Sequence, residues 1–281
     1  MTSDQWHFSD RVLSLGRRAL VMGIVNVTPD SFSDGGQFAS ADAAVAHGLE
    51  LVRQGADILD VGGESTRPGS QPVTLDEELR RVVPVVEALA RQVAVSISID
   101  TSKAEVARRC LAAGAHIVND ITALGDPEMA EVVGAANAGV VLMHMQGTPA
   151  TMQADPQYDD VVADIRRHLE ARLQWCGERG IAAERVALDP GIGFGKTRDH
   201  NLEILARLGE LQTLGRPVCL GVSRKGFMGR LLDRPVDQRL AGSLAAACWA
   251  VAHGSAQIVR VHDVAETLDA VRVLAAIAEH R

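Results

Sequence analysis

Polar or glycine residues stand where eight short apolar runs of the sequence end. A single polar residue there is expected, because strands end in turns. The eight positions are Asn26; Gly62, Gly63 and Glu64; Asp100; Asn119; His144; Asp189; Ser223, Arg224 and Lys225; and Arg260 with His262. These positions include three carboxylates, two amides, a lysine and an arginine, which is more than turns need. These residues therefore predict one ligand site assembled from many strand ends.

Two of the carboxylates favour a ligand that carries adjacent N–H groups. Asp100 and Asp189 each follow apolar residues, and a buried carboxylate needs hydrogen-bond donors to stay charged. The guanidine-like edge of a guanine or a pterin offers two such donors. Asn119 would donate and accept along the same edge, and Lys225 would donate to a carbonyl oxygen. Alternatively, either aspartate caps a following helix; TSKAEVA after Asp100 suits that interpretation, and Pro190 after Asp189 does not.

Arg260 and His262 alternate with valines in IVRVHDV, so both point to one face of the last strand. Together they would hold a phosphate group, although pairing of Arg260 with a carboxylate is equally compatible with the pattern. Asn26 and the carboxylates near it suit Mg²⁺, a hard cation that takes oxygen ligands and often binds through substrate phosphates.

The segment from Met22 to Gly36 joins the first of these strands to a loop of hydroxyls and carboxylates. An almost continuous apolar run over 19–27 is typical of a parallel strand buried on both faces. A plain polar turn is the alternative for the residues that follow it, which include Asp34.

Two motif-like strings do not encode the sites that they resemble. In PGIGFGKT a proline, Pro190, stands where a nucleotide-binding P-loop needs its first glycine, and Lys196 stands where a dinucleotide fingerprint needs its third. Lys225 is placed like a Schiff-base lysine, but its neighbours Ser223 and Arg224 do not indicate an apolar pocket that would lower its pKa.

The apolar runs alternate with segments of helical period, giving eight β/α units in about 280 residues. We therefore predict a single-domain α/β protein, a TIM (β/α)8 barrel over residues 19–281 that follows a short N-terminal segment, residues 1–18. A doubly wound open sheet is the alternative, but it usually has fewer strands and a glycine-rich first turn.

Composition excludes several classes of partner. With 28 basic against 36 acidic residues the net charge is −8, which disfavours nucleic acid and anionic membranes. No apolar run approaches the roughly 20 residues that span a bilayer. The N-terminus lacks the apolar core of a secretory signal, and the four cysteines are far apart, so we expect buried thiols in a cytoplasmic protein.

The segment 238–253, QRLAGSLAAACWAVAH, has Arg239 as its only fully charged residue, although an outer helix of a barrel should show water a polar face. A second subunit would cover it and make a homodimer. Cover by neighbouring helices of the same chain is the alternative.

Eight segments together resemble dihydropteroate synthase in order and spacing, and the match spans nearly the whole chain after residue 18. They are MGIVNVTPDSFSDGG, DVGGESTRPGS, SIDTSKAEVA, IVNDI, LMHMQGTP, LDPGIGFGK, GVSRKGFMG and RVHDV. The resemblance implies condensation of a dihydropterin CH₂ diphosphate with 4-aminobenzoate to give dihydropteroate and diphosphate, in folate biosynthesis.

The resemblance also implies roles for residues of this chain. Asp100, Asn119, Asp189 and Lys225 would hold the pterin, and Asn26, Arg260 and His262 the diphosphate, with Mg²⁺ at Asn26. Loops containing Asp34 and containing Thr66, Arg67 and Pro68 would close over the site, placing Phe32, Pro68 and Lys225 near 4-aminobenzoate. Gly226 departs from the family, in which serine is common at this position and touches the aminobenzoate carboxylate.

Two other functions fit part of the pattern. A methyltetrahydrofolate-corrinoid methyltransferase would share the pterin-binding residues but would not need the diphosphate pair or the DSFSDGG loop. A catalytically silent pterin-binding paralogue would not need the intact catalytic positions that this chain has.

Overall fold

The computed structural model describes residues 4–16, 18–27, 36–66 and 69–280, with residues 36–40 described by their backbone alone. Eight parallel strands form one sheet in the order β8-β7-β6-β5-β4-β3-β10-β9. They are β3 (Leu20–Asn26), β4 (Ile58–Gly62), β5 (Ser96–Asp100), β6 (Ile117–Asp120), β7 (Gly139–Met143), β8 (Val186–Asp189), β9 (Cys219–Leu220) and β10 (Ile258–Val261). A parallel bridge between Leu188 and Val218 joins the two ends of the sheet. The predicted TIM barrel and its eight strand-forming runs are confirmed.

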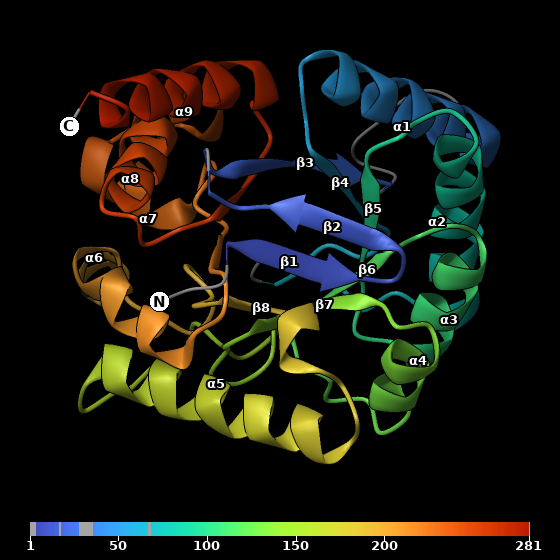
Figure 1. The fold of residues 1–281 in the computed structure, drawn as a ribbon, viewed down its shortest axis with the longest axis horizontal. Helices are drawn as coiled ribbons and strands as arrows, with labels where there is room; N and C mark the ends of the chain where they lie inside the picture. Colours follow the sequence, from blue (N-terminus) through green and yellow to red (C-terminus); the bar gives the residue numbers. More distant parts are fainter. Residues whose placement is uncertain (1–3, 17, 28–35, 67–68, 281) are drawn as a thin grey trace.

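Helices follow the strands and surround the barrel as a ring (Figure 1). They are α1 (Gly36–Arg53), α2 (Leu75–Ala90), α3 (Ala104–Ala112), α4 (Met129–Ala135), α5 (Val161–Glu178), α6 (Arg198–Arg207), α7 (Gly226–Leu232), α8 (Leu240–Ala252) and α9 (Val264–Ala278), with short 3₁₀ turns η2 (Ala183–Arg185), η3 (Leu208–Leu214) and η4 (Val236–Gln238). Every second strand residue packs outward against this ring, as Val21, Leu59 and Ile97 do. The strands are apolar on both faces for this reason, and they read as continuous runs.

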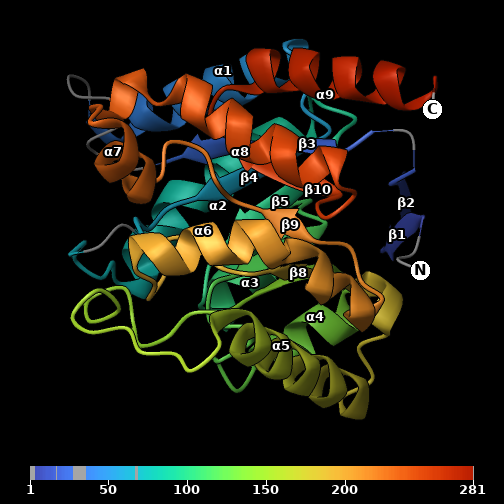
Figure 2. The ribbon, with the colours of Figure 1, turned by 90° about the vertical axis from the view of Figure 1, so that its left-hand side faces the viewer.

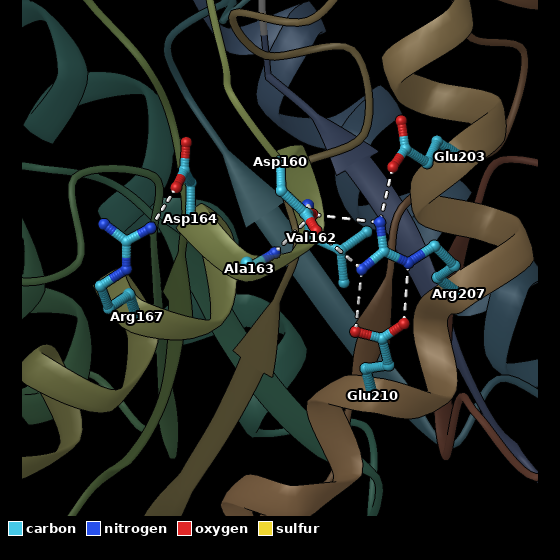
Figure 3. A network of polar contacts seen from close by, with 8 residues as sticks. All are labelled: Asp160, Val162, Ala163, Asp164, Arg167, Glu203, Arg207 and Glu210. Carbon is cyan, nitrogen blue, oxygen red and sulfur yellow. Dashed lines mark hydrogen bonds and ion pairs between the residues drawn. The ribbon is translucent and has the colours of Figure 1, made fainter.

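The helix that follows β7 begins at a well-defined cap. Asp160 accepts hydrogen bonds from the backbone N–H groups of Val162 and Ala163, both at 3.0 Å, which satisfies two donors at the start of α5. Both terminal nitrogens of Arg207, at the end of α6, also donate hydrogen bonds to this carboxylate. Arg207 in turn pairs with Glu203 and Glu210 (Figure 3). One arginine thus ties the start of α5 to the end of α6.

The chain before the barrel forms a hairpin of β1 (Gln5–Phe8) and β2 (Arg11–Ser14). Trp6 and Phe8 are buried among residues at the amino-terminal ends of the barrel strands, including Leu20, Met22 and Ile58. The indole N–H of Trp6 donates to the carbonyl of Arg185 at 2.9 Å. The hairpin lies across one end of the barrel, and the loop between β7 and α5 lies at the other (Figure 2). The sequence analysis left this segment without structure.

The structure also bears on the predictions about membrane spans and cysteines. No helix among the described residues is long and apolar enough to cross a membrane. All four cysteines carry free thiols, and Cys110, Cys176 and Cys219 are buried, whereas Cys248 is partly exposed.

Candidate active site

The carboxyl ends of the strands bring several predicted residues to one level of the barrel. Register pairs join Asn26 to Gly62, Gly62 to Asp100, and Asp100 to Asn119 across four adjacent strands. Residues in register on parallel strands face the same side of a sheet, and here that side is the barrel interior. Asp189, at the end of β8, is in register with Met143. Residues up to 163 positions apart therefore line one mouth.

Arg260 is the centre of an ion-pair network inside this mouth. Its Nε lies 2.6 Å from Asp60 Oδ2 and its Nη2 lies 2.7 Å from Asp100 Oδ2. The amide of Asn119 donates to the same Asp60 oxygen at 3.0 Å. Of the two interpretations of Arg260 left open by the sequence, the structure contains the carboxylate pairing.

Asp60 is a site residue that the sequence analysis missed. It lies within β4 two residues before Gly62, so it points into the barrel one layer below the rim, and it is fully buried. A signal was present, since Asp60 is the only charged residue in the run ILDVGG. Asp60 was not predicted because only residues at the ends of strands were considered.

The surroundings of Asp100 disfavour its charged form. Burial raises the pKa of Asp100 to about 7, and the nearby carboxylates of Asp60 and Glu78 act in the same direction, whereas Arg260 opposes the rise. The alternative role of Asp100 as a helix cap is wrong, because the residue at the N-cap of α3 is Lys103.

Asp189 and Lys225 face the mouth from its other side. Asp189 Oδ1 accepts the backbone N–H of Gly191 at 2.7 Å, and burial raises its pKa. The ammonium of Lys225 lies 4.3 Å from the centre of the Phe194 ring. Burial lowers the pKa of Lys225 to about 8, while the charge of Asp189 acts in the opposite direction.

This lowered pKa of Lys225 corrects the inference drawn from its chain neighbours. Arg224 directs its guanidinium to Asp263. The aromatic ring that packs on the Lys225 ammonium comes instead from the loop after β8, about 30 residues earlier in the sequence. Neighbours in space, and not in the chain, determine the environment of the lysine.

His262 lies at the end of β10, and its Nδ1 is 3.0 Å from the Ser223 hydroxyl. The backbone N–H of His262 donates to the same oxygen at 3.2 Å. Ser223, which follows β9, thus fixes the orientation of the imidazole at the rim.

Other strand-end residues have mainly structural partners. Glu64 pairs with Lys103, which also pairs with the fully buried Glu78. His144 is buried, with its Nδ1 3.0 Å from the Lys196 ammonium. Met143 packs with Met152 and Phe194. The contacts of His144 and Met143 are therefore those of packed core residues.

Several predicted site residues cannot be placed. Phe32, Asp34, Arg67 and Pro68 lie outside the described residues. Thr66 is described and is partly buried. The predicted loop contacts to 4-aminobenzoate thus stay predictions.

Comparison with known proteins places this mouth in a chemical context. A family model described as "Pterin binding enzyme" matches residues 22–262. The dihydropteroate synthase of Escherichia coli strain K12 is 52% identical over 256 residues, which cover 91% of this chain and 90% of the relative. The dihydropteroate synthase of Xanthomonas albilineans, solved with 4-aminobenzoic acid, superposes with a TM-score of 0.92 at 49% identity, covering 99% of each chain.

A further structure of the Xanthomonas albilineans enzyme, in complex with 7,8-dihydropteroate, matches with a TM-score of 0.89 at 46% identity and covers 98% of each chain. Fold and sequence agree with these relatives over nearly the full length. The chain therefore belongs to the dihydropteroate synthase family of pterin-binding enzymes.

Proposed function

We propose that this barrel mouth condenses (7,8-dihydropterin-6-yl)methyl diphosphate with 4-aminobenzoate in folate biosynthesis. The arylamine nitrogen forms a bond to the methylene carbon, the bond from that carbon to the diphosphate oxygen breaks, and the amine loses a proton. The products are 7,8-dihydropteroate and diphosphate. The observation that carries the proposal is the convergence of Asp100, Asn119, Asp189 and Lys225 on one mouth.

The pterin is the partner that these four side chains suit. Asp189 is buried and the Asp100 side chain is only 12% exposed, and the paired N–H donors of a pterin would stabilise their charged forms. Asn119 would both donate and accept, and the Lys225 ammonium would donate to a ring acceptor.

Arg260 and His262 would hold the leaving diphosphate. The guanidinium has five N–H donors, and its bonds to Asp60 and Asp100 occupy two nitrogens. A diphosphate would be bound by the remaining donors together with the imidazole. Stabilising the charge that develops on the departing oxygen would accelerate the loss of diphosphate.

Residues for 4-aminobenzoate are proposed from the family resemblance. They are Phe32, Thr66, Arg67, Pro68 and Lys225, with the loops of Asp34 and Arg67 closing over the site to exclude water. At Gly226 an added Cβ would meet no atom within 4 Å, so the position has room for the serine of other family members.

Mg²⁺ is the proposed cofactor, with Asn26 as its protein ligand. The described residues contain no cluster of three His, Cys, Asp or Glu side chains that could hold a metal ion. An amide oxygen at the end of β3 fits an ion that keeps several waters and binds mainly through substrate phosphates. When bound, Mg²⁺ would neutralise charge on the diphosphate as it leaves.

A homodimer in the cytoplasm is proposed on two grounds. Trp249 on α8 is 51% exposed, and the apolar side chains of Leu231, Leu232 and Val236 on α7 and η4 are exposed as well. A second copy of the chain would bury these side chains. Four free thiols fit a reducing compartment.

The decisive experiment is a coupled synthesis assay with purified protein and Mg²⁺. We expect dihydropteroate to form, and diphosphate to be released in step with the consumption of 4-aminobenzoate. Asp189→Ala should abolish pterin binding, and Arg260→Ala should chiefly weaken binding of diphosphate. Asp269→Ala, at an exposed position on α9, is the control. If the wild-type protein makes no dihydropteroate, the proposal is wrong; equal pterin affinity in wild type and Asp189→Ala would contradict the assignment of Asp189.

A further inference from the structure

A completely buried lysine lies directly behind the mouth. Lys196 precedes α6 and has no exposed surface. Its Nζ lies 2.8 Å from the carbonyl oxygen of Phe194, 3.0 Å from Nδ1 of His144 and 3.3 Å from the carbonyl oxygen of His144. An ammonium has three donors, and each of them has an acceptor here. This is the arrangement that a buried lysine needs to be tolerated.

The acceptors join two loops that border the site. His144 follows β7 and Phe194 follows β8, so Lys196 bridges neighbouring strand ends. The loops approach so closely that a Cβ added to Gly191 would lie 1.9 Å from the His144 carbonyl oxygen. Gly191 has a φ of +69°, a conformation that glycine tolerates. The backbone around Lys196 has little room to move.

The loop from Gly191 to Phe194 contacts proposed pterin-binding residues at both of its ends. At one end the N–H of Gly191 donates to Asp189 Oδ1 at 2.7 Å. At the other end the Phe194 ring lies against the Lys225 ammonium. The loop that Lys196 anchors thus orients one pterin carboxylate and places an aromatic ring on the pterin lysine.

Electrostatics supports this coupling. Burial lowers the pKa of Lys196 to about 7, the Lys225 charge lowers it further, and the Asp189 charge opposes both effects. Burial and the Lys196 charge lower the pKa of His144 to about 2, so its ring stays neutral and accepts from the Lys196 ammonium through Nδ1 in the tautomer that carries its proton on Nε2.

We propose that Lys196 is a positioning residue for catalysis: it fixes the loop from Gly191 to Phe194 and thereby sets the orientation of Asp189 and the environment of Lys225. The inference rests on the proposed function, since it assigns Lys196 to the pterin-binding face. Lys196 itself is enclosed and contacts no substrate.

The test compares wild type with Lys196→Met. Lys103, Lys196 and Lys225 are the only lysines in the chain, so competitive acetylation over a pH series, read by mass spectrometry, reports the titration of Lys225 cleanly. Loosening of the loop would relieve the burial that lowers the pKa of Lys225, so the Lys225 midpoint should move upward, toward the ordinary lysine value of about 10.4. Misplacement of the pterin groups should also weaken pterin binding, measured by isothermal titration, and lower kcat/KM by about 10-fold to 100-fold.

Two further variants separate positioning from general loop stability. Tyr158→Phe removes another donor to the same loop, the Tyr158 hydroxyl that binds the Gly195 carbonyl oxygen at 2.8 Å. It should leave the Lys225 titration and pterin affinity unchanged. Phe194→Leu keeps the carbonyl that Lys196 binds but removes the ring, whose face attracts the ammonium, so it should lower the Lys225 midpoint, the opposite of Lys196→Met.

The outcomes are distinct. An unchanged Lys225 titration and unchanged pterin affinity in Lys196→Met would overturn the inference, as would an equal effect of Tyr158→Phe. If Lys196→Met does not fold, Lys196→Gln, which retains two N–H donors, is judged by the same two measurements. Because acetylation does not depend on turnover, absence of dihydropteroate from wild type would contradict the proposed function and leave the test of Lys196 intact.

Discussion

At the scale of single residues, two shifted pKa values define a pH window for pterin binding. Asp100 must be ionised to accept N–H groups, and its pKa is about 7; Lys225 must be protonated to donate, and its pKa is about 8. We expect pterin affinity to rise as the pH increases through 7 and to fall as it increases beyond 8. Isothermal titration with the pterin diphosphate over a pH series measures this.

The variant Asp100→Asn should remove the acidic limb of that profile and keep the alkaline limb. A profile that is flat through both pKa values in wild type would contradict the assignment. The same shift affects stability with a defined sign. The folded state binds more protons than the unfolded state between the ordinary Asp pKa of about 4 and the raised value, so the contribution of Asp100 to stability falls as the pH rises through that range.

The site residues that the sequence predicted are those at strand ends, because parallel strands direct their carboxyl ends to one mouth. Asp60 was missed because it lies a layer deeper, and its role depends on Arg260, which is 200 positions away. The environment of Lys225 was misjudged for the same reason, since Phe194 approaches it from another loop. A local sequence pattern does not indicate contacts between residues that are distant in the chain.

At the scale of elements, variants of Asp160 at the junction of α5 with α6 distinguish the contribution of a helix cap to stability from that of an ion pair. Asp160→Asn should lower the melting temperature only slightly, because asparagine caps helices about as well as aspartate and exposed ion pairs contribute little. Asp160→Ala should lower it more, because the N–H groups of Val162 and Ala163 lose their acceptor. Thermal unfolding followed by circular dichroism measures both variants. An equal loss in the two would show that the pair with Arg207 dominates (Figure 3).

The barrel strands were predictable as elements, whereas the N-terminal hairpin was not. A parallel strand that packs on both faces reads as an unbroken apolar run, as ILDVG nearly does. The hairpin strands have four residues each, in which exposed positions stand beside buried or partly buried ones. An alternation this short does not differ from that of an irregular segment.

At the scale of the whole molecule, the hairpin closes one end of the barrel and leaves the polar mouth at the other (Figure 2). Trp6 is fully buried against inward-facing residues of the barrel. We propose that residues 1–18 and the barrel over 19–281 unfold as one cooperative unit. The core beneath the mouth is then continuous with the hairpin, and stability at one end supports geometry at the other.

Trp6→Ala tests this unity. Removing a buried tryptophan costs about 3–5 kcal/mol, because the transfer free energy is lost and a cavity remains. The hydrogen bond to the Arg185 carbonyl is lost as well. Urea unfolding followed by circular dichroism should show one transition at a lower midpoint. Val12→Ala, at a hairpin position that is 53% exposed, should change the midpoint little. If the barrel transition kept its midpoint in Trp6→Ala, the hairpin would be a separate segment. The lower midpoint is expected because Trp6 packs on Leu20, Met22 and Ile58, which are residues of the barrel strands themselves.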